Sequence, residues 1–260
     1  MPRLRLRARP GLPLALLIAV ASGALLSAAF PPVGAWPVAF FALAPLLWLL
    51  ADAEPRRGFV LGLGYGLAFH GATLYWILRF GELAWVALAI VSALWVATFG
   101  ALVPGLRRQG RPVVTMLAIA SAWTVLEWLK GMWPLGGFTW GTICVSQVDN
   151  LATVRLGTVA GVWGVTFAVV AVNAAVAVVA GGLGAEGGTG RRWTWVAFGV
   201  SVFLAVAPLA LPFAVADGRP VDVATLQIDV REASEGSSVD EDLLVAALTI
   251  AQHERLLGGT

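Results

Sequence analysis

Long apolar runs without charge, separated by short connections that carry arginine, constrain this chain more than any other feature. Hydrophobic residues make up 59% of the 260 residues, and charged residues make up only 12%. Soluble domains carry roughly 25% charged residues, whereas a helix that crosses a bilayer needs about 20 consecutive apolar residues. The sequence therefore predicts an α-helical bundle that is integral to a membrane.

About seven spans can be placed between the turns and the charged connections. They cover 12–30, 35–51, 58–77, 83–106, 112 into the stretch after 123, 156–183 and 193–216. Pro37 and Pro45 are expected to kink the second span, because proline removes a helical hydrogen bond. Gly157, Gly161 and Gly164 are expected to let the sixth span approach a neighbouring helix closely.

The distribution of arginine predicts the orientation of these spans. With the N-terminus in the cytoplasm, alternating crossings place most arginines on the cytoplasmic side: Arg3, Arg5, Arg7, Arg9, Arg56, Arg57, Arg107, Arg108, Arg111, Arg191 and Arg192. The outer short loops then hold only Arg79, Lys130 and Arg155. Because such a bias orients membrane proteins, we expect a cytoplasmic N-terminus and an extracytoplasmic segment after residue 216.

The stretch from Trp123 to Gln147 interrupts the regular pattern. After Glu127 and Lys130 it breaks at Gly131 and Pro134, and the remainder is apolar and aromatic but too short to cross a bilayer. Irregular backbone at membrane depth is tolerated only inside protein or beside a water-filled cavity. We expect either a helix end followed by a re-entrant or interfacial segment, or a loop on the bilayer surface.

Aromatic and polar side chains gather at the predicted outer surface. The candidate lipid-binding residues are Tyr75, Trp76, Glu127, Lys130, Trp140 and Gln147. Such a mouth could hold a lipid headgroup and an acyl chain, although an ordinary aromatic belt is the simpler explanation for any single tryptophan. Glu127 and Lys130 could instead form an i,i+3 ion pair that closes their helix.

Several common kinds of site are excluded by the residues present. A single cysteine, Cys144, excludes an internal disulfide and a CxxC metal site. There is no GxSxG, P-loop or HExxH pattern, so no metal or cofactor is expected. The glycines from Gly62 to Gly66 lie in an apolar span without a preceding strand, which indicates close helix packing. Nucleic acid is not an expected partner, because the arginines fit membrane orientation better.

Two further residues of the bundle have expected structural roles. Cys144 lies in an apolar run and is expected to be a packed, unreactive thiol. His70 lies inside the third span, where we expect it to be hydrogen-bonded within the bundle. A proton relay through His70 has no support from a second titratable group in the spans.

The character of the chain changes after Asp217. Residues 221–230 predict a buried strand, and Ser238 to Glu241 form a capping box that opens a helix. One strand and one helix cannot bury a stable core alone. We therefore expect 1–216 to be the membrane bundle and 217–260 to be the first βα unit of a truncated α/β domain.

Together these features resemble the N-terminal half of an apolipoprotein N-acyltransferase. The matching residues are Phe30-Pro31-Pro32, Trp36-Pro37, Tyr75-Trp76, Glu127 to Gly131, Gly137-Phe138, Trp140, Ser146-Gln147, Gly161 to Phe167 and Asn173. The strand through Gln227 resembles the opening strand of the family's nitrilase-like domain. Thr139, Val145 and Asp229 depart from the family's usual proline, aromatic residue and asparagine.

The resemblance implies a multi-pass enzyme of the bacterial inner membrane that acts as a monomer without a cofactor. Its acyl donor would be a phospholipid, and its acceptor the amino group of diacylglyceryl-cysteine at the N-terminus of an apolipoprotein. The family's catalytic Cys, Glu and Lys lie in the nitrilase-like domain, which by this register would follow Thr260. The resemblance thus implies no catalytic residue in this chain, which alone would be inactive.

Three other readings stay open at this point. Glu127, Lys130 and Cys144 contain the same three residue types as the family's catalytic set, but the apolar surroundings of Cys144 disfavour a reactive thiolate. A small transporter or permease could use a Pro-kinked, Gly-rich bundle, although no charge lies in mid-span to couple ions. A non-catalytic membrane scaffold that binds lipid is the third alternative.

Overall fold

The computed structural model describes residues 10–108, 110–134, 136–180 and 188–210, and all regular structure within them is helical. The α-helices are α1 (Leu12–Ser27), α2 (Ala44–Leu50), α3 (Pro55–Thr73), α4 (Glu82–Leu106), α5 (Pro112–Lys130), α6 (Leu151–Val179) and α7 (Gly188–Val206). Short 3-10 helices are η1 (Trp36–Phe40), η2 (Tyr75–Phe80), η3 (Ile143–Gln147) and η4 (Ala207–Ala210). The predicted strand at 221–230 and the helix after 238 lie outside the described residues.

Three helices of the described part, α4, α5 and α6, are long and apolar enough to cross a membrane. The apolar segments Leu12–Ser27 and Trp36–Leu50 are shorter. The helical fold is confirmed, and the candidate spans α4 and α5 run over nearly the residues of the predicted fourth and fifth spans. The full count of seven crossings stays a prediction.

Prolines begin helices in this chain. Pro55 and Pro112 each occupy the first turn of their helix, where the missing N–H has no partner to lose. Pro37 and Pro45 likewise lie in the first turns of η1 and α2. The prediction of one kinked helix in the second span is therefore wrong, because this segment forms two short helices, η1 and α2, joined by a turn.

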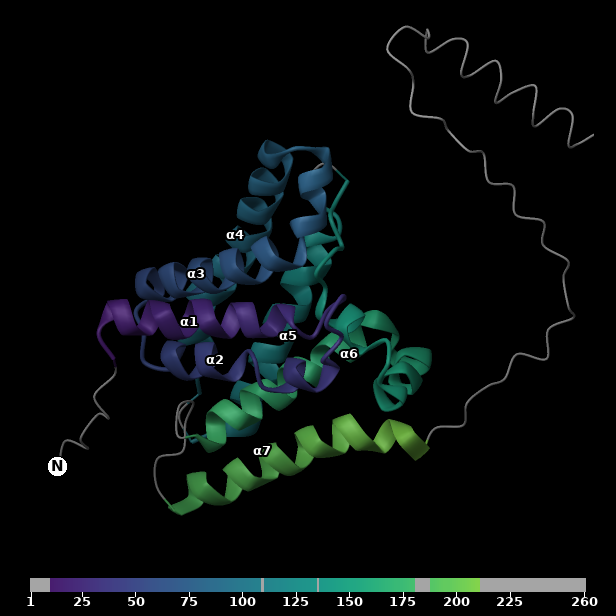
Figure 1. Cartoon of the computed structure of the whole chain (residues 1–260). Coiled ribbons are helices and arrows are strands. Elements are labelled where there is room, and N and C mark those ends of the chain that lie inside the picture. The colour runs from purple at the N-terminus through teal and green to yellow at the C-terminus, as the bar shows by residue number, and fades with distance from the viewer. Residues whose placement is uncertain (1–9, 109, 135, 181–187, 211–260) are drawn as a thin grey trace, which may run out of the picture. The chain divides into compact units, whose positions relative to one another are not determined.

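Close contact between α3 and α4 depends on glycine. A Cβ placed on Gly62 would lie 2.5 Å from the carbonyl oxygen of Val96, and one on Gly58 would lie 2.2 Å from that of Gly100. Helix α1 also lies alongside α3 (Figure 1). A Cβ placed on Gly23 of α1 would lie 2.2 Å from the carbonyl oxygen of Tyr65. The packing role predicted for the glycines from Gly62 to Gly66 is confirmed.

The glycines of α6 behave differently from the prediction. Gly161 has a positive φ of 65° and breaks the helix into two parts, and a Cβ there would meet nothing within 4 Å. A Cβ on Gly164 would meet only Ala160 of the same helix. The expected helix–helix contact through these glycines is wrong, because Gly161 supplies a backbone conformation that other residues rarely adopt.

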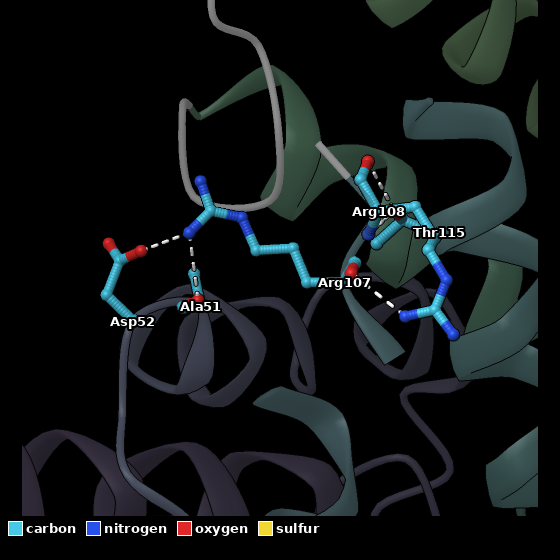
Figure 2. A network of polar contacts seen from close by, with 5 residues as sticks. All are labelled: Ala51, Asp52, Arg107, Arg108 and Thr115. Atoms are coloured by element: carbon cyan, nitrogen blue, oxygen red, sulfur yellow. Dashed lines mark hydrogen bonds and ion pairs between the residues drawn. The ribbon is translucent and has the colours of Figure 1, made fainter. Parts of the chain in front are cut away.

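Arginines gather where α4 ends and α5 begins, which we call the basic end (Figure 2). Arg107 donates through Nη1 to the carbonyl oxygen of Ala51 at 3.2 Å and pairs with the carboxylate of Asp52. The backbone N–H of Arg108 donates to Oγ1 of Thr115 at 2.9 Å. Phe99 packs against Trp123, and Trp95 packs against Trp133, so α4 and α5 run antiparallel. The start of α4 and the end of α5 therefore lie at the opposite end, which we call the aromatic end. The bilayer side of each end stays a prediction.

Candidate functional site

The segment between α5 and α6 folds back against the helices. Ile143, Ser146 and Gln147 of η3 are buried, whereas Trp133 and Trp140 are more than half exposed. One side of the segment is thus surrounded by protein, as irregular backbone at membrane depth requires. This arrangement favours the expected re-entrant or interfacial segment over a loop that lies only on a bilayer surface.

Glu127 fixes the inner side of this segment. Its side chain is buried, and its Oε1 accepts a hydrogen bond from the backbone N–H of Ile143 at 3.0 Å. Its Oε2 accepts from the hydroxyl of Thr166 on α6, also at 3.0 Å. Hydrogen bonds to an ionised group are among the stronger ones in proteins. One carboxylate therefore joins α5, η3 and α6.

Lys130 holds the outer part of the same segment. The ammonium is buried and donates to the carbonyl oxygen of Trp140 at 3.1 Å. Within the described residues no ion pair joins Lys130 to Glu127. The predicted i,i+3 pair is wrong, because each side chain instead binds backbone that follows the helix.

Two amides make similar connections through η1 and α2. Gln147 donates through Nε2 to the carbonyl oxygen of Trp36 at 3.1 Å. Asn173 accepts through Oδ1 from the backbone N–H groups of Leu43 and Ala44, at 2.9 and 3.1 Å. Asn173 also donates to the carbonyl oxygen of Ala39 at 2.8 Å. An amide in an apolar helix must find such partners, because none is available in lipid.

A pocket at the aromatic end brings two of the candidate residues together. The rings of Trp76 and Trp140 lie 4.6 Å apart between centroids. Both line a cavity of about 380 Å³, together with Phe30, Pro31, Thr73, Thr139, Gly141 and Val145. Ligand pockets typically measure about 300–1,000 Å³ and are mostly apolar, as this one is. We call it the aromatic pocket.

The other candidate residues have different positions. Tyr75 is half exposed and is not part of the lining. Glu127, Lys130 and Gln147 are buried, are not part of the lining either, and form hydrogen bonds with protein groups. Lipid binding by any of the six residues stays a prediction. Sequence reasoning gave no role to Thr166, because nothing in its apolar helix marks it as a partner of Glu127.

Cys144 has the surroundings of an unreactive thiol. It is partly buried in η3. Burial, and secondarily the charge of Glu127, raise the pKa of Cys144 to about 11. Both oxygens of Glu127 already accept hydrogen bonds from Ile143 and Thr166. These three observations disfavour Cys144 as a nucleophile with Glu127 as its base.

His70 is buried on α3, and its Nδ1 atom has no hydrogen-bond partner in the described part of the chain. The expectation of a satisfied histidine is therefore wrong for this atom. Among the described residues, no three His, Cys, Asp or Glu side chains come together as metal ligands. The absence of a metal centre stays a prediction for the chain as a whole.

Comparison with known proteins places this arrangement in a family. The family model of the apolipoprotein N-acyltransferase N-terminal domain matches residues 22–175, more than half of the chain. A protein named apolipoprotein N-acyltransferase from Geobacter metallireducens is 33% identical over 166 residues, which cover 60% of this chain and 32% of the relative. One of the same name from Pseudomonas syringae pv. tomato is 30% identical over 242 residues, or 86% of this chain and 46% of the relative.

A third relative of that name, from Rhodopseudomonas palustris, is 33% identical over 207 residues, which cover 73% of this chain and 38% of the relative. The aligned part thus spans between 32% and 46% of these relatives. The matched region contains the aromatic pocket and the buried residues Glu127, Lys130 and Asn173. The chain belongs to the apolipoprotein N-acyltransferase family.

Proposed function

We propose that this chain works in an acyltransferase that moves an acyl chain from a phospholipid to the amino group of diacylglyceryl-cysteine at the N-terminus of an apolipoprotein. Family membership over residues 22–175 is the observation that carries this proposal. The bundle of residues 1–216 would cross the bacterial inner membrane about seven times, with the N-terminus in the cytoplasm. Residues 217–260 would begin an extracytoplasmic nitrilase-like domain.

Chemically, the transfer would proceed in two steps through a cysteine thioester. A thiolate attacks the carbonyl carbon of the phospholipid ester, and the glycerol oxygen leaves with a proton as the lysophospholipid forms. The acceptor amine then attacks the thioester, an amide bond forms, and the thiol is released. A Glu serves as the base and a Lys stabilises the oxyanion in each step. We assign these roles to the nitrilase-like domain and none of them to Cys144.

The bundle's part would be to present the phospholipid. The aromatic pocket has a volume suited to part of a lipid and a mostly apolar lining. Tryptophan favours the membrane–water boundary, so the pair formed by Trp76 and Trp140 would lie where a headgroup meets its acyl chains. Glu127 and Lys130 would act as positioning residues that fix the wall of this pocket.

The experiment expresses the complete reading frame that contains this sequence in bacteria depleted of their own N-acyltransferase. Mass spectrometry of a lipoprotein's N-terminal peptide then counts its acyl chains. We expect the third chain, the N-linked one, to appear. If the lipoprotein keeps two chains while the protein reaches the membrane in normal amounts, the proposal is wrong.

The topology has a separate test. Reporter fusions at Gly187 and Gly236 report on the connection before the seventh predicted span and on the segment after it. We expect the two fusion points on opposite sides of the membrane. Finding them on the same side would contradict the seven-span map while leaving family membership intact.

A further inference from the structure

A small cavity lies inside the bundle next to the two buried charges. It is lined by three helices, with His70 from α3, Trp95, Val96 and Phe99 from α4, and Trp123, Leu126, Glu127 and Lys130 from α5. The room it leaves for the centre of a water molecule is about 20 Å³. One water needs about 10–15 Å³ by the same measure, together with two to four polar partners. The cavity therefore suits one water molecule and is too small for an organic ligand.

Two of the side chains that line the cavity have polar atoms without a partner. Nδ1 of His70 and Nε1 of Trp123 are both buried and make no hydrogen bond within the described residues. Their side chains are only 2% and 4% exposed, respectively. The indole of Trp123 approaches the Glu127 carboxylate, but not with the geometry of a hydrogen bond. Because buried polar groups in native proteins are nearly always bonded, each of these two atoms indicates a partner other than a protein group.

Lys130, which lines the same cavity, has N–H donors that no described residue accepts. An ammonium carries three N–H donors. The described residues supply one acceptor, the carbonyl oxygen of Trp140 at 3.1 Å, and the side chain is only 4% exposed. Glu127 has the opposite capacity, because an ionised carboxylate can accept more than the two bonds that Ile143 and Thr166 donate.

We propose that this cavity is an internal hydration site that binds one water molecule. The water accepts hydrogen bonds from the indole N–H of Trp123 and the ammonium of Lys130, and it donates to His70 and to the carboxylate of Glu127. These four bonds use the full capacity of a water molecule. The site keeps the charges of Lys130 and Glu127 solvated inside an apolar bundle and connects α3 to α5. It stands on geometry alone and does not depend on the proposed acyl transfer.

Radiolytic footprinting of the full chain in lipid nanodiscs tests the site in the unaltered protein. Hydroxyl radicals formed from a bound water oxidise the side chains next to it. We expect several-fold faster oxidation of His70 and Trp123 than of Met116, which is fully buried on α5 but does not line the cavity. Methionine is intrinsically easy to oxidise, so it is a strict control. Equal protection of all three residues would overturn the proposal.

A double-mutant cycle gives a second, independent measurement. If one water joins the two groups, His70→Leu and Trp123→Phe each lower the unfolding midpoint by about 2–4 °C, and the double variant loses less than the sum. If no water is bound, any loss in each single variant comes from packing alone, and the two effects add. Trp95→Phe removes the same ring volume from the cavity wall and controls for packing.

Discussion

The two ends of the bundle hold charge in different ways. At the basic end, the side chain of Asp52 is 33% exposed where it meets Arg107, so water shares in its solvation. At the aromatic end, Glu127 and Lys130 are 6% and 4% exposed and depend on backbone groups of the segment that follows α5. A hydrated charge needs no protein partner and can help to orient the chain in the membrane. A buried charge is stable only when protein groups form hydrogen bonds with it.

The largest difference between the two ends is expected in the free energy of unfolding when one acidic residue of each end, Glu127 or Asp52, is replaced by alanine. Glu127→Ala should lower the free energy of unfolding by about 3–5 kcal/mol, because it removes two buried hydrogen bonds to an ionised group, each worth about 1.5–3 kcal/mol. Asp52→Ala should cost at most about 1 kcal/mol, as is usual for exposed pairs. Thermal unfolding of both variants in nanodiscs measures the difference. Equal losses would mean that the two ends do not differ as described.

A smaller effect is expected on the rate of acyl transfer when a tryptophan that lines the aromatic pocket is replaced. Trp140→Ala should lower the rate of N-acylation about tenfold at limiting phospholipid, because the lost ring contact is worth about 0.5–1.5 kcal/mol beyond its buried area. The matched control is Trp133→Ala, an exposed tryptophan of the same segment that does not line the pocket. It should change the rate less than twofold. Equal losses in the two variants would favour an ordinary aromatic belt over a lipid site.

Sequence reasoning reached the basic end and the long helices but not the organisation of the aromatic end. The bounds of α4 and α5 follow from local hydropathy and from the charges that flank each run. The partners of Glu127 lie 16 and 39 positions away, at Ile143 and Thr166, so no local pattern reveals them. The four bonds of Asn173 are similarly hidden, because three of them reach the η1–α2 region about 130 positions away.

Local backbone events were equally hard to predict. Proline between apolar residues fits both a kink and the first turn of a new helix, and Pro45 lies in the first turn of α2. Gly161 fits a helix contact or a break, and the break was the outcome. At the start of α2 a distant partner stabilises the conformation that is adopted, because Asn173 accepts hydrogen bonds from the backbone N–H groups of Leu43 and Ala44.

The last prediction concerns the thiol of Cys144, and the direction in which its labelling rate changes separates two roles for Glu127. With a pKa of about 11, Cys144 is almost wholly protonated at neutral pH. Its labelling by a water-soluble maleimide should rise about tenfold per pH unit from 7 to 10 without levelling off. A reference thiol, Val33→Cys in a Cys144→Ser background, is exposed and should level off near pH 9.

Glu127→Gln then distinguishes the alternatives for the same thiol. The charge of Glu127 disfavours the thiolate, so its removal should lower the pKa of Cys144 and speed labelling at a fixed pH. A carboxylate that acted as a base toward Cys144 would give the opposite result, because its loss would slow labelling. Slower labelling in a variant that keeps the native unfolding midpoint would make Cys144 a nucleophile and move part of the chemistry into the bundle. Faster labelling would leave the aromatic end with a positioning role alone.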